Sequence, residues 1–160
     1  MPIRKIISGG QTGADRAALD FALENNFETG GWIRKNRLAE DGRIPENYPN
    51  LRETETENPA ERTELNVQDS DATMIFSHGD LKGGSKLTVE MCDKHAKPCL
   101  HVNFEKTDFA QAVKKAQQFI IFSHCQTLNI AGARTSEDAR IYEKTKDFLN
   151  QLFKTFNNLS

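Results

Sequence analysis

The sequence has few cysteines and almost no net charge, and each shortage excludes classes of protein. Cys92, Cys99 and Cys125 form an odd set without C-x-x-C spacing, so neither a disulfide framework nor a zinc ribbon is indicated, and we expect buried, reduced thiols. Lys and Arg together number 21, against 23 for Asp and Glu. This balance argues against nucleic acid as a partner.

Long apolar runs and two common nucleotide-binding signatures are also missing. No run approaches the ~20 residues of a membrane-spanning helix, and residues 1–7 lack the apolar core of a signal peptide. We therefore expect a cytoplasmic protein without a membrane partner. Neither G-x-x-x-x-G-K-S/T nor G-x-G-x-x-G occurs, which disfavours a P-loop NTPase and an ordinary dinucleotide fold. The length of 160 residues suits one domain over 1–160.

What the chain does contain is a regular alternation of apolar strands and amphipathic helices. Strands are predicted at 3–7, 29–33, 72–77, 99–104 and 128–131. Helices are predicted at 13–25, 58–69 and 86–96, then from Thr107 and from Ser136 onward. Such alternation predicts a Rossmann-like three-layer αβα fold, with a doubly wound parallel sheet of about five strands. The order 2-1-3-4-5 would place a ligand between the first and third strands.

A glycine-rich loop follows the first predicted strand and opens the first helix. Glycines there allow backbone N–H groups to approach an anion, and the helix N-terminus adds partial positive charge. Thr12 with Asp15 resembles a capping box. We predict that this loop binds phosphate through Ser8, Gly9, Gly10, Gln11, Thr12, Gly13 and Arg16.

A second glycine-rich loop, 79–88, follows the third predicted strand and supplies a second anion cradle. The residues predicted to bind there are Gly83, Gly84, Ser85, Thr88 and Glu90. Glu90 could contact the ligand or act as an acid or base, or it could be an exposed helical residue. After the last strand, Arg134 could line the edge of the crevice, or Thr135 or Ser136 could simply cap the next helix.

The segment 34–58 is polar, interrupted by prolines and without a clear period. It is predicted to be a long loop, which could serve as a lid over the ligand or be a solvated insertion. Its basic residues favour the lid, and Trp32, Lys35 and Arg37 are predicted contacts.

Several ordered motifs together resemble the putative molybdenum carrier family. They are the run from Ser8 to Arg16, Gly30-Gly31-Trp32, Ala39-Glu40-Asp41-Gly42, Ala60-Glu61-Arg62-Thr63, Asp69-Ser70-Asp71-Ala72-Thr73 and Gly83-Gly84. The resemblance spans nearly the whole chain, from Ile6 to about Tyr142. That family is related to molybdenum cofactor carriers and to lysine decarboxylase-like phosphoribohydrolases. The resemblance implies a crevice for molybdopterin or a nucleotide derivative, and a homo-oligomer, either dimer or tetramer.

The resemblance to the phosphoribohydrolases is incomplete. Their P-G-G-x-G-T-x-x-E motif is matched by Gly83, Gly84 and Glu90, but Lys86 replaces the third glycine and Thr88 comes one position late. The carrier family's Trp-Cys-Pro-Lys-Gly segment reads Trp32-Ile33-Arg34-Lys35-Asn36, so its thiol is absent.

These departures favour binding over catalysis. The first hypothesis is a molybdenum cofactor carrier that holds a small phosphorylated ligand. The second is a phosphoribohydrolase-like enzyme in which Glu90 assists cleavage of an N-glycosidic bond. The third is a sensor of nucleotide derivatives.

Overall fold

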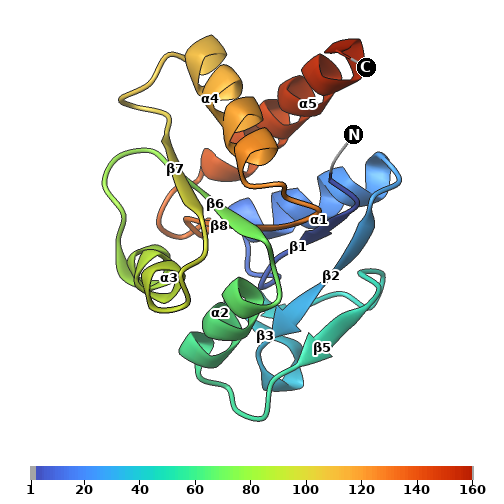
Figure 1. The fold of residues 1–160 in the computed structure, drawn as a ribbon. Coiled ribbons are helices and arrows are strands. Elements are labelled where there is room, and N and C mark those ends of the chain that lie inside the picture. The colour runs from blue at the N-terminus through green and yellow to red at the C-terminus, as the bar shows by residue number, and fades with distance from the viewer. Residues whose placement is uncertain (1–2, 160) are drawn as a thin grey trace.

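Residues 3–159, which the computed structural model describes, form a six-stranded parallel sheet with helices on both faces (Figure 1). A two-stranded antiparallel ribbon lies apart from this sheet. The sheet strands are β1 (Lys5–Ile7), β2 (Glu28–Ile33), β5 (Leu51–Glu53), β6 (Ala72–Ser77), β7 (Cys99–Asn103) and β8 (Thr127–Gly132). The ribbon consists of β3 (Leu38–Ala39) and β4 (Gly42–Arg43), preceded by the 3₁₀ helix η1 (Lys35–Arg37). The helices are α1 (Ala14–Glu24), α2 (Pro59–Gln68), α3 (Gly83–Lys94), α4 (Phe109–Phe122) and α5 (Ile141–Leu159).

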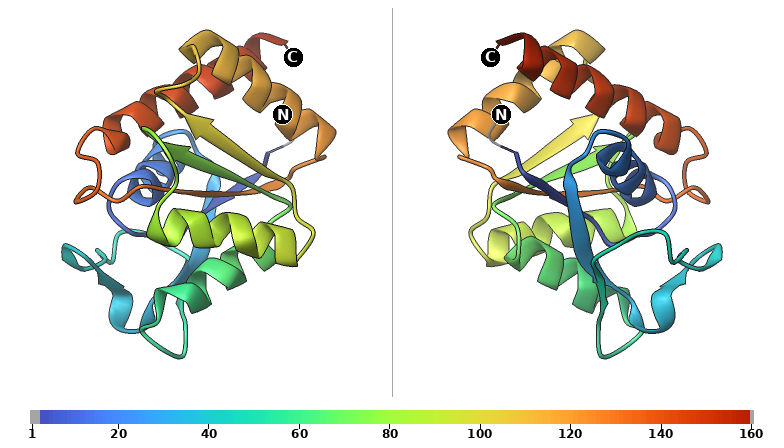
Figure 2. Two further views of the ribbon diagram at one scale, coloured as in Figure 1. Left: turned by 90° about the vertical axis from the view of Figure 1, so that its left-hand side faces the viewer. Right: turned by 90° about the vertical axis from the view of Figure 1, so that its right-hand side faces the viewer.

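The helices form two layers, which confirms the predicted three-layer α/β fold. Helices α1, α4 and α5 cover one face of the sheet, and α2 and α3 cover the other (Figure 2). In α1, small apolar residues spaced three and four apart face the sheet, so the helix packs closely against it. Among the described residues, no helix is both long and apolar enough to cross a membrane.

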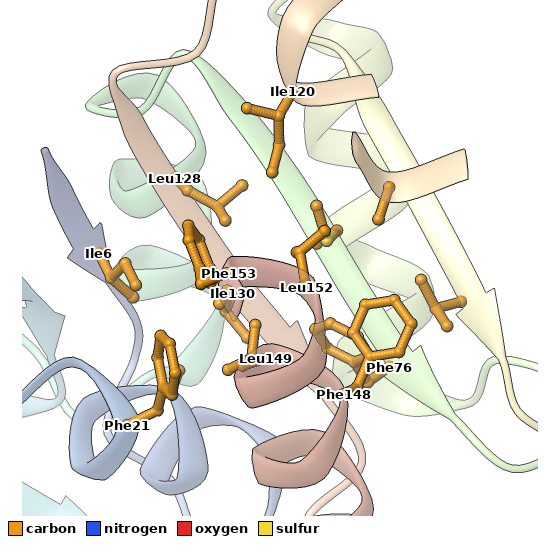
Figure 3. Packing of buried hydrophobic residues seen from close by; sticks show 14 of the residues in the cluster. Ile6, Phe21, Phe76, Ile120, Leu128, Ile130, Phe148, Leu149, Leu152 and Phe153 are labelled. Atoms are coloured by element: carbon orange, nitrogen blue, oxygen red, sulfur yellow. The ribbon is translucent and has the colours of Figure 1, made fainter. Parts of the chain in front are cut away.

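The main core fills the space between the sheet and the layer of α1, α4 and α5 (Figure 3). Phe76 from β6 and Phe148 from α5 are fully buried there, with ring centroids 5.2 Å apart in an edge-to-face contact. A smaller apolar cluster, which includes Leu19, Ile33 and Ile44, joins α1 to the segment that follows β2. The smaller cluster anchors this segment at the carboxyl end of β2.

The strand order differs from the predicted 2-1-3-4-5, because the last strand lies in the middle of the sheet. The observed order is β5-β2-β1-β8-β6-β7, with Leu128 of β8 beside Ile6 and Ile130 beside Met74. Leu128 and Ile130 are completely buried, as a central strand requires. If the chain is read cyclically from β8, the order of the six strands becomes 4-3-2-1-5-6. Without the short edge strand β5, the other five strands have the order 3-2-1-4-5 found in the Rossmann sheet.

The segment 34–58, predicted to be a long loop, contains short regular structure instead. Its ribbon of β3 and β4 folds back toward α1, and β5 extends the sheet beside β2. Two- and three-residue strands leave almost no periodic signal in a sequence, which explains why they were not predicted.

Several helix starts also differ from the prediction. Gly13 precedes α1 with φ 83° and without a side-chain capping bond, so the predicted capping box of Thr12 and Asp15 is wrong. Helix α3 begins at Gly83, three residues before the predicted start. Asp108, not Thr107, caps α4 by accepting a hydrogen bond from the Gln111 N–H. Helix α5 begins at Ile141, after a turn that contains Ser136.

Candidate functional site

The chain leaves two neighbouring strands, β8 and β6, toward opposite faces of the sheet. After β8 it enters α5 on the face of α1, whereas after β6 it enters α3 on the other face. In doubly wound sheets, ligands bind beyond the carboxyl ends of the strands at such a switch point. The predicted crevice between β1 and β6 is therefore divided by β8, and the loop after β8 is central to the site instead of at its edge.

A cleft of about 150 Å³ lies at this place. Helices α2 and α3 form one wall, and the first glycine-rich loop and the loop after β8 form the other. The residues that line it are Gln11, Asp15, Arg34, Pro59, Arg62, Thr63, Gly84, Ser85, Leu87, Thr88, Ala131, Gly132, Arg134 and Glu137. Both glycine-rich loops contribute to one cleft, although only some of their predicted residues do so.

Arginine is the dominant cation of the cleft, with Arg34, Arg62 and Arg134 among its described lining residues. Burial lowers the pKa of Arg62, the Asp15 carboxylate opposes this shift, and the positive charges of Arg34 and Arg134 lower the pKa further. The three guanidinium groups therefore repel one another across the cleft. An anion bound between them would relieve this repulsion and accept charge-assisted hydrogen bonds.

Asp15 lies at the bottom of the cleft, beside Arg62. The Arg62 Nη1 atom is 3.9 Å from Asp15 Oδ2, and the two side chains are 15% and 7% exposed. Burial raises the pKa of Asp15 to about 6, while Arg62, the Gln11 N–H and Arg16 act in the opposite direction. Gly9 leaves room for this pair, since a Cβ at Gly9 would lie 2.3 Å from Arg62 Nη1.

The first turn of α3 lines the cleft with Gly84, Ser85 and Thr88. Ser85 and Thr88 are buried on the inward face of the helix, and the Thr88 hydroxyl donates to the Gly84 carbonyl at 2.9 Å. A Cβ at Gly84 would meet no atom within 4 Å, so the cleft is open at this glycine. The helix N-terminus adds positive potential to that of the arginines.

Backbone N–H groups of the first glycine-rich loop donate hydrogen bonds to acceptors within the protein. Those of Gly10, Gln11 and Thr12 donate to Ser8 Oγ, Asp15 Oδ2 and Gln11 Oε1, at 3.3, 3.2 and 3.0 Å. Ser8 is fully buried, and its hydroxyl donates to the Asp15 carbonyl. Gly13 packs against the loop after β8, where its added Cβ would lie 2.3 Å from the Ala133 carbonyl oxygen. Phosphate binding by this loop stays a prediction, and it would require these bonds to exchange.

Thr12 is engaged by the ribbon of β3 and β4. Its hydroxyl donates to the Glu40 carboxylate and accepts from the Thr135 N–H. Glu40 also accepts from the N–H and the hydroxyl of Ser136, and it lies 3.6 Å from Arg134. The Glu40 carboxylate thus accepts the hydrogen bonds of the polar groups of Thr12 and Ser136 next to the cleft.

Other predicted contacts are held outside the cleft by partners of their own. Arg16 forms a bidentate pair with Asp41, at 3.2 Å for each bond. The Trp32 indole donates to Asp69, and Arg37 donates to two backbone carbonyls of its own segment. The Lys35 side chain is exposed. None of these four residues is among the described lining of the cleft.

Glu90 lies on the exposed side of α3, two residues from the inward-facing Thr88. Positions two apart project in different directions on a helix, so the start of α3 at Gly83 turns Thr88 inward and Glu90 outward. The structure thus agrees with the alternative that Glu90 is an exposed helical residue.

Arg62 and Asp15 were missed as site residues by sequence reasoning. Arg62 entered only as part of a family motif, and Asp15 only as a capping residue. A usable signal was the polar inward face of α2, where Thr63 and Asn66 are buried beside Arg62. Buried polar side chains on a helix face that should be apolar indicate a site or a hydrogen-bond network.

The cyclic strand order and the position of the cleft define a Rossmann-like protein whose first strand and helix have moved to the end of the chain. The model of the circularly permutated YpsA SLOG family matches residues 6–153, and the chain belongs to this family. A comparison with curated proteins gives no match.

A solved structure with the same architecture is that of a putative molybdenum carrier protein from Syntrophus aciditrophicus SB. It is 50% identical in sequence and superposes with a TM-score of 0.92 over 94% of this chain and 95% of that chain.

Proposed function

We propose that this protein is a carrier that binds a small phosphorylated ligand, either a molybdopterin-type cofactor or a nucleotide derivative, in the cleft beside β8. The observation that carries the proposal is the convergence of Arg34, Arg62 and Arg134 on one cleft at the switch point of the sheet. Arginine forks match the geometry of phosphate oxygens, and the first turn of α3 lines the same cleft. The name of the similar Syntrophus protein, a molybdenum carrier, supports a molybdenum-related ligand.

The residues of the cleft fit the phosphate of a molybdenum cofactor better than they fit the metal. In residues 3–159, no group of three or more His, Cys, Asp or Glu side chains is placed to hold a metal ion. A volume of about 150 Å³ is below the roughly 300–1,000 Å³ of sites that enclose a drug-sized ligand. The cleft would therefore hold the phosphate end, and the pterin with its metal would extend outward.

Thermal unfolding tests the proposal, with a nucleoside monophosphate and a phosphorylated pterin as probes. A ligand at about 100 times its Kd should stabilise the protein by about 2.7 kcal/mol, which is a rise of several degrees in Tm. Arg134→Gln should reduce the rise, because it removes one guanidinium from the cleft. Arg52→Gln is a matched control, since Arg52 stacks on Trp32, 4.1 Å from the ring, outside the cleft.

A rise of equal size in the Arg134→Gln variant would place the ligand elsewhere. No rise with either probe would overturn the proposal.

Two further expectations accompany this proposal. The family resemblance implies a dimer or tetramer, which light scattering of the purified protein would measure. An N-glycosidic hydrolase is not favoured, because the carboxylate of Glu90 is exposed on α3 and outside the described lining of the cleft.

A further inference from the structure

We propose that binding of a dianionic group at Arg62 is coupled to the uptake of one proton by Asp15. The inference rests on the proposed function, because it concerns the same cleft, and it adds the charge of the ligand group and the role of Asp15. Asp15 is then a positioning residue: it holds Arg62 while the cleft is empty and releases it when the ligand arrives.

The geometry places Asp15 and the ligand in competition for the same guanidinium. Arg62 lines the cleft with its side chain 15% exposed, and its Nη1 atom is 3.9 Å from the carboxylate beneath it. The Asp15 carboxylate is itself part of the cleft lining. A phosphate that accepts hydrogen bonds from Arg62 therefore brings its negative charge close to a buried carboxylate.

Few groups could neutralise that carboxylate once Arg62 turns toward the ligand. On the same helix, Arg16 is directed toward Asp41 and pairs with it. From the first loop, only the N–H of Gln11 donates to the Asp15 carboxylate in the described structure. Helix α3 presents Ser85 and Thr88 to the cleft, which carry no charge.

The remaining cations of the cleft have partners other than Asp15. Arg134, from the loop after β8, lies 3.4 Å from Glu137 and 3.6 Å from Glu40. Arg34, from the segment after β2, donates from Nε to the Glu57 carbonyl at 2.6 Å. A buried carboxylate close to a dianion and with a weakened cation therefore takes a proton from solvent. Arg62 stays charged, the proton adds to a carboxylate oxygen of Asp15, and no covalent bond to the ligand forms.

Isothermal titration calorimetry with sulfate tests the coupling. Sulfate keeps two negative charges between about pH 5.5 and 8.5, so any change in bound protons comes from the protein. The binding enthalpy, measured in buffers with different ionisation enthalpies, should indicate an uptake that approaches one proton near pH 7.5. The Kd should rise by up to about tenfold per pH unit above about pH 6.5 and level off below pH 6, where Asp15 already holds its proton.

Two variants separate Asp15 from the rest of the cleft. Asp15→Asn should abolish the proton uptake and make the Kd independent of pH, close to the value of the wild-type protein at low pH. Glu137→Gln is the matched control, since it neutralises a carboxyl group in the same cleft that pairs with Arg134 and not with Arg62. It should retain the proton uptake.

Three outcomes would overturn the inference. Binding of sulfate to the wild-type protein without proton uptake would overturn the inference but leave the proposed function intact. This measurement does not depend on the folding of a variant. Proton uptake that persists in Asp15→Asn would assign it to another group. A sulfate Kd that stays constant between about pH 6.5 and 8.5 would likewise reject the coupling, because binding that takes up a proton must weaken as the pH rises.

Discussion

Gly9 and Gly13 belong to the same loop, but a methyl group at each would meet very different neighbours. At Gly9 the nearest atom is the end of the Arg62 side chain, at 2.3 Å, which can swing away. At Gly13 the nearest atom is the Ala133 carbonyl oxygen, also at 2.3 Å, and φ is +83°. Gly9 therefore leaves room for the Arg62 side chain, whereas Gly13 allows the close packing of two backbone segments.

This contrast predicts opposite phenotypes for two alanine substitutions. Gly9→Ala should displace the Arg62 guanidinium, so ligand affinity should fall while the free energy of unfolding changes little. Gly13→Ala should destabilise the protein by about 2–3 kcal/mol or more, because both the backbone strain and the clash are unavoidable. Urea unfolding of both variants, together with sulfate titration, checks the prediction. Equal loss of stability in both would contradict it.

The pKa of Asp15 predicts how stability depends on pH. Its folded value of about 6 exceeds its ordinary value of 3.8, so between these values the folded state binds more protons than the unfolded state. Stability should therefore be highest below about pH 4 with respect to this group and fall as pH rises toward 6, by up to about 3 kcal/mol. Asp15→Asn should lack this loss. Urea unfolding at about pH 4, 5, 6 and 7 would refute the prediction if the two curves ran parallel.

Among the elements, the ribbon of β3 and β4 makes polar contacts with the rest of the protein through two neighbouring carboxylates. Glu40 accepts three hydrogen bonds, and Asp41 pairs with Arg16. Burial acts to raise the pKa of Glu40, but hydrogen bonds from Ser136 and Thr12 outweigh it, so the pKa is lowered. Tyr48, farther along the same segment, donates a hydrogen bond to Asp20 of α1. Glu40, Asp41 and Tyr48 thus each tie the segment 34–58 to the rest of the protein, and Glu40 does so next to the cleft.

Glu40→Gln should loosen the ribbon without unfolding the protein. The amide presents one acceptor oxygen in place of a carboxylate that accepts from three donors, so hydrogen exchange should accelerate in 38–43 and in the loop 133–136. Glu46→Gln is the control, since Glu46 is exposed on the same segment and pairs with Arg43. Unchanged exchange in Glu40→Gln would contradict this prediction and show that the Arg16–Asp41 pair and the apolar contacts of Ile44 suffice to hold the ribbon.

The elements were largely predictable from the sequence, whereas their lateral order was not. Apolar runs such as Met74 to Phe76 and the spacing of Ala14, Ala17 and Phe21 depend on local physics, namely which face each residue buries. Strand order depends on contacts distant in sequence, such as that between Thr73 and Asn129. For the same reason, the positions of the glycine-rich loops could be predicted from the sequence. The internal hydrogen bonds of their N–H groups, and the contact between Arg62 and Asp15, could not.

At the scale of the whole molecule, the cyclic order of the sheet predicts that the chain can be rejoined. Arg4 near the start of β1 and Asn157 near the end of α5 line the same hollow, and both ends lie close together in Figures 1 and 2. A variant with a flexible linker between these ends, opened between Ser123 and His124, should keep the fold. Circular dichroism and sulfate affinity should match those of the parent protein. A chain opened inside β8, between Asn129 and Ile130, should not fold.

The central place of β8 also has a consequence for the order of events on the ribosome. The pairs β1–β2 and β6–β7 are synthesised first, yet both β1 and β6 find their other neighbour only in β8, which emerges almost last. Until then the nascent chain carries two open sheet edges, whose free N–H and C=O groups can pair with other chains. We expect this protein to depend on protection of its unfinished chain more than a Rossmann protein whose central strand is made first.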